Sequence, residues 1–509
     1  MDGVPGRWWS LAVLSLGGLV VGLDTTVLNV ALPTLATDLG ASTSQLQWFA
    51  DAYLLVLAVL LLPGGLLGDK AGRKPMTLVS LAIFGVGSLW SAYAGSPGSL
   101  IAARALMGVG AAFLTPLTFA WMIVLFHLRE RPKAMGALGG AAFIGLPLGP
   151  ILAGWLLDHC FWGSVFLINV PLIVIALVGG AILLPGGGAR SDRDVDWIGI
   201  VLSVVGLAGL TYGLIEAPVR GWGDVLVLGT VVGGLVVLVG FVRWESAQGR
   251  RALMDVSVWR LPAFSWGTGV LVASTLLGMV ALFSTPLYLQ GVLGVDAFGA
   301  GVRLVPMIGG IVVGVVASLA ISQRRTYKAA VLLGLIMIAV GSALAARTTV
   351  GSGYGWTGAW LAVFGIGFGA IMISGQNLAL NTLDEARAGV GGAIAQVMRQ
   401  TGGVVGVAVL ISVLSSVYRG HVDVAGLPPA VGDAVKSSVQ SGLAVARELG
   451  SPELAASVKS AFLTGMGVQM WLSVALALVV AVAVFLAMPR GLGKTDREAD
   501  DRRMSDRTQ

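Results

Sequence analysis

The sequence predicts an all-α integral membrane protein, and three observations carry this prediction. The chain of 509 residues is 56% hydrophobic and only 11% charged, whereas about a quarter of the residues in a soluble domain are charged. Its apolar residues form long continuous runs, and a helix of about 20 apolar residues crosses a bilayer. The runs do not alternate with a period of two, which excludes an outer-membrane β-barrel.

Each apolar run ends at glycine, proline or charged residues, and these boundaries predict fourteen transmembrane helices. The first six form one group, two follow as an insertion, and the last six form a second group. The predicted helices span residues 10–32, 48–67, 76–94, 99–126, 134–157, 164–184, 197–215, 225–242, 263–289, 300–321, 329–346, 356–380, 391–417 and 463–488.

This grouping predicts two six-helix bundles plus two inserted central helices. The N-terminal bundle occupies residues 10–184 and the C-terminal bundle residues 263–488, while residues 185–262 hold the two inserted helices with their cytoplasmic linkers. Residues 1–9 are expected to form a cytoplasmic N-terminus. Residues 489–509 are charged and poor in apolar side chains, which predicts a disordered cytoplasmic tail.

Lysine and arginine are distributed unequally between the two sides of the predicted spans. Six of the 32 lie in segments assigned to the outside, three lie within spans, and the others lie inside. Because cytoplasmic loops carry the excess of these residues, both termini are predicted to be cytoplasmic. Four of the six outer charges fall within residues 418–462, whose polar composition predicts an ordered outer hairpin. The bias toward Arg, Gly, Ala and Val is typical of GC-rich genomes, so we expect a multi-pass protein of a bacterial cytoplasmic membrane.

A weak internal repeat relates the two six-helix groups. The inner turn Gly65–Lys74 is weakly similar in sequence to Ala317–Lys328, and each segment lies between the second and third helix of its group. Duplicated halves around a site near the membrane midplane are the architecture of secondary transporters. The repeat therefore favours a transporter built from two related bundles.

Asp24 lies near the centre of the first predicted helix, and an acid at that depth costs about 2.5 to 3.5 kcal/mol unless it is paired. Its expected partner is Arg104, one to two turns into the fourth helix and at a similar depth. Ionisable residues inside a membrane usually serve a function, so we interpret the two as a proton-coupling pair. The alternative is an ion pair that serves helix packing alone.

The fifth predicted helix contains the sequence Gly145-Leu-Pro-Leu-Gly149-Pro150-Ile-Leu-Ala-Gly154. Glycines four or five residues apart let another helix approach closely, and proline removes backbone hydrogen bonds and bends a helix. Generic glycine packing is the alternative in so glycine-rich a chain. The Gly-Pro pair favours a functional interpretation.

The inner turn combines Gly65 and Gly72, which permit a tight turn, with Asp69 just past the second helix and the basic pair Arg73 and Lys74. Asp69 is expected to accept hydrogen bonds or to pair with a basic residue, as an inner latch that opens during switching. An anchoring cluster that follows the positive-inside rule is the alternative, and it explains the basic residues but not the acid.

The sequence argues against several other functions. Cys160 is the one cysteine and the three histidines are far apart, so neither a disulfide nor a local metal motif is predicted. The scattered basic residues form no patch for nucleic acid. The segment Gly353–Gly358 fits the dinucleotide pattern, but no strand precedes it. We therefore expect neither an enzyme nor a cofactor, and an ion gradient as the source of energy.

In their order along the chain, these stretches resemble the major facilitator superfamily, and in particular its fourteen-helix drug:proton antiporters of bacteria. The resemblance covers residues 7–489 and rests on four motifs: Leu23–Pro33, Gly65–Lys74, Leu100–Ala112 and Gly145–Gly154. It implies the major facilitator fold. It also implies that Asp24 and Arg104 take part in proton coupling, that Asp69 takes part in switching, and that the fifth-helix motif closes the pathway. Some relatives that export dications add an acid in helix 10 or 13, where this chain has Ile308–Val316 and Gln396.

Together these features favour a proton-coupled antiporter that exports amphipathic antibiotics or drugs and confers resistance. The expected partners are the small drug, protons and the lipid bilayer, and the expected oligomeric state is a monomer. Two alternatives stay open: a proton-coupled importer of a small metabolite, which should lack the Gly149-Pro150 motif, and a non-transporting membrane enzyme or sensor, which should have polar catalytic clusters within its spans. The side chains expected to line the substrate cavity are Trp48, Tyr53, Phe113, Phe143 and Gln396.

Overall fold

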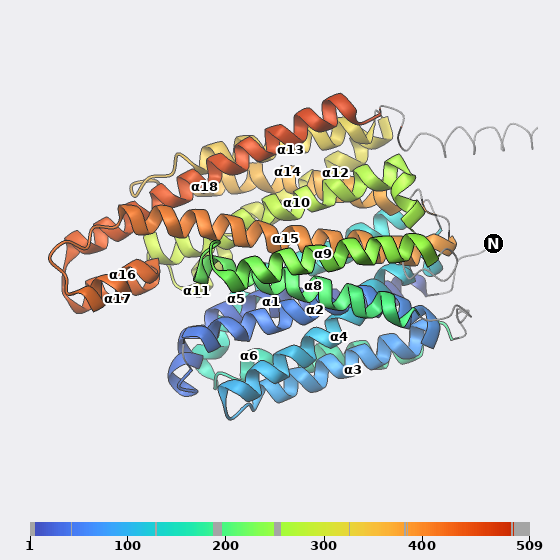
Figure 1. The fold of residues 1–509 in the computed structure, drawn as a ribbon, viewed down its shortest axis with the longest axis horizontal. Coiled ribbons are helices and arrows are strands. Elements are labelled where there is room, and N and C mark those ends of the chain that lie inside the picture. The colour runs from blue at the N-terminus through green and yellow to red at the C-terminus, as the bar shows by residue number, and fades with distance from the viewer. Residues whose placement is uncertain are drawn as a thin grey trace, which may run out of the picture. The chain divides into compact units, whose positions relative to one another are not determined.

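The computed structural model describes residues 6–41, 43–127, 130–186, 196–248, 256–324, 326–380, 383, 385–489 and 492. Throughout these described residues the chain is helical, with turns between helices and no β-strand, which confirms the predicted all-α class (Figure 1). The helices of the first part are α1 (Arg7–Asp38), α2 (Thr43–Ala71), α3 (Arg73–Ala92), α4 (Pro97–Leu125), α5 (Arg131–His159), α6 (Ser164–Leu167), α7 (Asn169–Leu183), α8 (Trp197–Arg220) and α9 (Val225–Gln248).

The second part begins with two short or interrupted elements and ends in long helices. Its elements are η2 (Val256–Arg260), α10 (Pro262–Leu287), the π-helical turn η3 (Tyr288–Val292), α11 (Ala297–Val302), α12 (Val305–Arg324), α13 (Tyr327–Ala345), α14 (Tyr354–Leu380), α15 (Glu385–His421), α16 (Pro429–Ser437), α17 (Val439–Glu448) and α18 (Pro452–Ala487).

Twelve helices among the described residues are long and apolar enough to cross a membrane. They include α8 and α9, which correspond to the predicted insertion. Helices α2 and α5 are not among the twelve although each runs over 29 residues, and α2 contributes a shorter apolar stretch, Trp48–Leu61. The count of fourteen spans therefore stays a prediction.

Some predicted helices differ from the observed ones for local physical reasons. The tenth predicted helix is divided into α11 and α12, and Pro306 lies in the first turn of α12, where its missing N–H is tolerated. Pro286 lies inside α10, directly before the π-helical turn at Tyr288. Helix α15 extends slightly beyond its predicted end at residue 417, to His421, and α18 begins at Pro452, well before its predicted start at residue 463. Apolar periodicity marks the membrane part of a helix and not its polar extension.

The chain folds into two compact units. Unit 1 comprises the described residues within Met1–Glu216, Arg220–Phe264 and Ala379–Thr401, and unit 2 those within Ala217–Val219, Ser265–Leu378 and Gly402–Gln509. Helices α8 and α9 thus belong with α1 to α7, and the first half of α15 belongs with them too. The predicted division into two bundles, an insertion and two termini stays a prediction.

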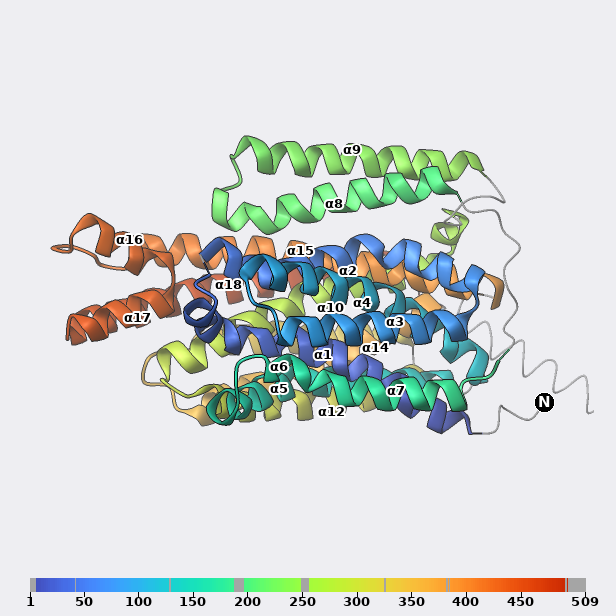
Figure 2. The ribbon, with the colours of Figure 1, turned by 90° about the horizontal axis from the view of Figure 1, so that it is seen from below.

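In unit 1 the helices pack in pairs, with α1 along α5, α2 along α4, and α3 against both α4 and α7. Apolar side chains fill the space between them in three clusters around Tyr53, Phe166 and Trp121. Helices α8 and α9 run side by side as a separate pair (Figure 2). Their backbones touch at Gly234, where a Cβ atom would lie 2.5 Å from the Leu210 nitrogen.

In unit 2, α13 packs along α18, and polar side chains join three of the helices inside the core. The Ser284 hydroxyl donates to Oε1 of Gln469 at 2.6 Å, and the Ser342 hydroxyl donates to Ser473 at 3.3 Å. Helices α16 and α17 lie side by side beyond the ends of α15 and α18 (Figures 1 and 2). The Tyr418 hydroxyl at the end of α15 donates to the Val435 carbonyl of α16 at 2.8 Å and so connects this pair of helices to α15.

The internal repeat has the same structural role in both units. Lys74, in the first turn of α3, donates from Nζ to the Leu184 carbonyl at the end of α7, at 2.7 Å. Lys328, in the first turn of α13, donates from Nζ to the carbonyls of Phe485 and Met488 at the end of α18, both at 2.7 Å. A cation at a helix carboxyl end satisfies orphan carbonyls and interacts favourably with the helix dipole. Each lysine therefore fastens the third helix of its group to the sixth.

We expect Lys74→Met and Lys328→Met each to lower the free energy of unfolding by about 1 kcal/mol, because each removes a charged donor from a helix end. Lys133→Met is the matched control, since Lys133 is an exposed lysine in the first turn of α5, at the unfavourable end of the dipole. Unfolding of the purified variants in mixed micelles measures the difference. Equal stability of all three variants would show that the caps do not contribute.

Candidate functional site

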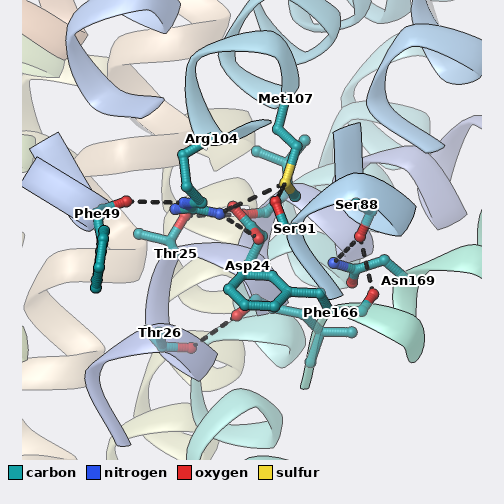
Figure 3. Close-up of polar contacts among 12 residues, drawn as sticks. Asp24, Thr25, Thr26, Phe49, Ser88, Ser91, Arg104, Met107, Phe166 and Asn169 are labelled. Atoms are coloured by element: carbon teal, nitrogen blue, oxygen red, sulfur yellow. Dashed lines mark hydrogen bonds and ion pairs between the residues drawn. The ribbon is translucent and has the colours of Figure 1, made fainter. Parts of the chain in front are cut away.

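A buried ion pair between α1 and α4 forms the centre of the candidate site (Figure 3). Nη1 of Arg104 lies 2.6 Å from each carboxylate oxygen of Asp24. Asp24 is 0% and Arg104 1% exposed. Removing either partner would leave an uncompensated charge in the core, at a cost of about 3 to 5 kcal/mol. The structure thus brings together the acid and the base that the sequence predicts as partners.

The guanidinium of Arg104 has further contacts that hold it from the side of α2. Its Nε donates to the Phe49 carbonyl at 2.9 Å, and its Cζ lies 4.7 Å from the centre of the Tyr53 ring. The Phe166 ring is 5.9 Å away, in cation–π range. The Met107 sulfur accepts a weak contact from Nη1 at 3.8 Å. The cation is therefore enclosed by three helices besides its own.

A second set of polar side chains, Ser88 and Asn169, holds Phe166 in position. The Ser88 hydroxyl donates to the Phe166 carbonyl at 2.8 Å, and Nδ2 of Asn169 donates to the Ser88 oxygen at 3.2 Å. Ser91 donates in turn to the Met107 sulfur at 3.4 Å. These side chains lie beside the ion pair in Figure 3. Ser88, Ser91 and Asn169 are polar residues within apolar runs, and this feature of the sequence could have identified them.

The fifth-helix glycines lie against the segment of α1 that carries Asp24. A Cβ atom at Gly145 would lie 2.6 Å from the Leu19 carbonyl oxygen and 2.8 Å from the Leu23 nitrogen. A Cβ atom at Gly149 would lie 3.0 Å from the Leu23 carbonyl oxygen and even closer to the Thr26 hydroxyl. Only glycine permits this approach, so these two residues set the distance between α5 and the acid-bearing turn.

The other residues of the fifth-helix motif are less informative. Gly154 lies half-buried on α5, further from the acid along the helix. The side chain of Pro150 lies outside the part of the chain that the structure describes. A role for the motif in closing the pathway stays a prediction.

The predicted switch residues lie at the junction of α2 and α3. Gly72 has a φ of 100°, which lets the chain turn between the two helices, and Gly65 lies within α2. Lys74 binds the end of α7, as described above, and Arg73 is half-buried at the start of α3. The side chain of Asp69 is outside the described residues. The structure does not bring the two basic residues to the Asp24 site, and the switch remains a prediction.

The predicted cavity residues have different surroundings. Trp48 packs on Tyr212 of α8, with ring centres 5.9 Å apart, and Phe113 is partly buried against the core of unit 1. Gln396 accepts a hydrogen bond from Nε of Arg399 at 2.9 Å within α15. Tyr53 is only 1% exposed and contacts Arg104, so it belongs to the ion-pair site and not to an open wall. The side chain of Phe143 falls outside the described residues.

Gly145→Ala should lower the free energy of unfolding by about 1 to 3 kcal/mol, because the new methyl group meets the backbone of α1. Gly140→Ala is the matched control on the same helix, since nothing lies within 4 Å of its Cβ position. There the gain in helix propensity, up to about 1 kcal/mol, should show without a clash. Unfolding of both purified variants checks this, and a stabilised Gly145→Ala would contradict the close packing of α1 on α5.

Comparison with known proteins identifies the family. The sequence model of the Major Facilitator Superfamily matches residues 14–407. The chain is 32% identical to the tetracenomycin C resistance and export protein of Streptomyces glaucescens, over 95% of this chain and 92% of that one. It is 31% identical to the multidrug efflux pump LfrA of Mycolicibacterium smegmatis, over 95% and 96% of the two chains. A crystal structure of a double Trp mutant of XylE shares the fold, with a TM-score of 0.63 at 14% identity over 97% of this chain and 98% of that one. The chain therefore belongs to the Major Facilitator Superfamily and is a multi-pass membrane transporter, not an enzyme, as its motifs predict.

Proposed function

We propose that this chain exports amphipathic antibiotics or drugs across the bacterial cytoplasmic membrane in exchange for protons, and thereby confers resistance. The observation that carries the coupling part of the proposal is the Asp24–Arg104 ion pair, fully buried in a transmembrane core. The substrate class is supported by the names of the relatives, which are resistance, export and efflux proteins.

The ion pair gives proton binding a direct structural consequence. An ionised Asp24 is attracted to Arg104, and a proton on the carboxylate removes that attraction while Arg104 keeps its charge. Protonation thus changes the balance of forces between α1 and α4, which make the pair. We infer that this change is coupled to alternating access between the two units, and that a drug leaves the cytoplasm for each proton that enters.

The remaining features of the proposal concern energy, orientation and assembly. The proton gradient supplies the energy, and no cofactor takes part. Both termini lie in the cytoplasm, because Lys and Arg are concentrated in the segments on that side. A single chain is the transporting unit, which chemical cross-linking in native membranes tests: a dominant cross-linked dimer would contradict it.

Asp24→Asn removes the counter-charge of Arg104 and should lower stability, but the amide oxygen can still accept from Arg104 and the contacts of Arg104 with Phe49 and Tyr53 remain, so the variant should insert and fold. It should abolish transport driven by a pH gradient, because an amide does not take up the proton. Arg104→Ala should fail as well, whereas Arg104→Lys keeps the charge and loses the planar fork. Asp158→Asn is the matched control, since Asp158 is exposed at the end of α5. Uptake of tetracenomycin C and other antibiotics into inverted vesicles measures the effect at equal expression. Wild-type rates for Asp24→Asn would refute the coupling role.

The orientation is tested at Cys160, which is exposed at the outer end of α5 in the proposed topology. A membrane-impermeant maleimide should label this thiol in intact cells. A cysteine introduced at Ser437, on α16, should behave in the same way. If both are labelled only after permeabilisation, the chain has the opposite orientation.

The charge of the exported compound should decide how strongly the gradient drives it, if one carboxylate carries one proton per drug. Exchange of one proton for a monocation moves no net charge, so the pH gradient alone drives it and one pH unit supplies about 1.36 kcal/mol. With a neutral drug one net positive charge enters, which adds ~2.3 kcal/mol from a 100 mV potential. With a dication one net positive charge leaves, which costs the same amount. Proteoliposomes with imposed gradients should therefore accumulate neutral and monocationic drugs but not methyl viologen, a dication. Uphill transport of methyl viologen under one pH unit and 100 mV would require a second proton site.

A further inference from the structure

Tyr53 contributes two different groups to the ion-pair site. The face of its ring covers the Arg104 guanidinium at 4.7 Å, and Phe84 of α3 packs edge-on against the ring, with centres 6.5 Å apart. The guanidinium that this ring covers also holds both carboxylate oxygens of Asp24 at 2.6 Å. Asp24 of α1 and Arg104 of α4 are therefore the charged groups of the site beside which the phenol lies.

The hydroxyl of Tyr53 is unsatisfied in the observed state. It is buried and has no hydrogen-bond partner among the described residues. A buried hydroxyl without a partner is unfavourable, and hydrocarbon offers no water to satisfy it. Such a group is accounted for if another state of the site supplies the missing partner.

Helix α2 holds Arg104 by contacts that do not depend on the charge of Asp24. The Phe49 carbonyl accepts from Nε at 2.9 Å, and the Tyr53 ring, one turn further along the same helix, covers the guanidinium. Arginine stays charged in proteins. A proton on Asp24 therefore removes the ionic attraction but leaves the cation fixed on α2, next to the carboxyl group.

We propose that Tyr53 is a positioning residue for proton exchange at Asp24. Its ring holds the Arg104 cation while Asp24 is protonated, and its hydroxyl becomes the hydrogen-bond partner of the neutral carboxyl group. A protonated carboxyl has one O–H donor, which the phenolic oxygen can accept. The site then alternates between two satisfied arrangements of the acid: Asp24 pairs with Arg104 when ionised and with Tyr53 when neutral. This inference rests on the proposed proton coupling and goes beyond it by naming the second partner.

Tyr53→Phe distinguishes the role of the hydroxyl from that of the ring, because it keeps the ring and removes the hydroxyl. Infrared difference spectra of the purified full-length protein in lipid, recorded between alkaline and acidic pH, detect the carbonyl stretch of a protonated carboxyl without requiring a known substrate. The band that is absent in Asp24→Asn belongs to Asp24. In Tyr53→Phe this band should move to higher wavenumber, because the neutral carboxyl has lost its hydrogen bond.

Thr285→Val is the matched control. Its hydroxyl is also fully buried and without a partner among the described residues, but it lies on α10 in unit 2. Both variants remove an unsatisfied hydroxyl, so both should be at least as stable to heat as the wild type at alkaline pH. At acidic pH Tyr53→Phe alone should lose this advantage, and Thr285→Val should leave the Asp24 band unchanged.

The outcomes separate this inference from the proposed function. If the wild type shows no titrating band that Asp24→Asn removes, the proton does not bind at Asp24 and the coupling proposal fails, together with the role of Tyr53. If the band is present and Tyr53→Phe leaves it unmoved, the inference about Tyr53 alone is overturned. A shift of the band in Thr285→Val as well would also overturn it, because the effect would then be general.

Discussion

Two opposite charges that have been taken out of water are the constraint on which unit 1 depends. Neither Asp24 nor Arg104 is stable alone in a membrane core, so the helices that carry them must stay in register. The contacts of Arg104 with Phe49, Tyr53 and Phe166 extend the constraint to α2 and α6. The glycines of α5 extend it further, since their close approach fixes α1 at the turn that carries the acid. These contacts thus connect α1, α2, α4, α5 and α6 around the two charges.

The sequence was sufficient to predict the ion pair because the cost of a lone charge in hydrocarbon leaves few alternatives. An acid and a base at the same depth of different helices must each find a partner, and here each is the other's. The contribution of Phe49 could not be predicted, because every residue has a backbone carbonyl and the sequence does not show which one accepts a hydrogen bond. The sequence places Tyr53 in a cavity wall, because an aromatic residue in an apolar run does not show which group its ring faces.

The fold was predictable where hydrophobicity decides it and less so elsewhere. Apolar runs located the membrane helices, but α15 and α18 continue beyond them. In α18 the added residues include Glu453, Ala455 and Lys459, which have high helix propensity. The sequence shows the internal repeat only as a weak similarity. The role of its lysines is visible only in the structure, because Lys74 and Lys328 bind carbonyls of helices that are far from them in the sequence.

The repeat also shows what the two units do not share. Both retain a lysine that caps the sixth helix of the group, which is a requirement of the scaffold. The polar contacts described in the core of unit 2, such as Ser284 with Gln469 and Ser342 with Ser473, join neutral groups, whereas unit 1 encloses a charged pair. Hydrogen bonds between neutral side chains do not change with the charge on a titrating acid. The two units therefore share the lysine contact at the end of the sixth helix, and they differ in the chemistry of these core contacts.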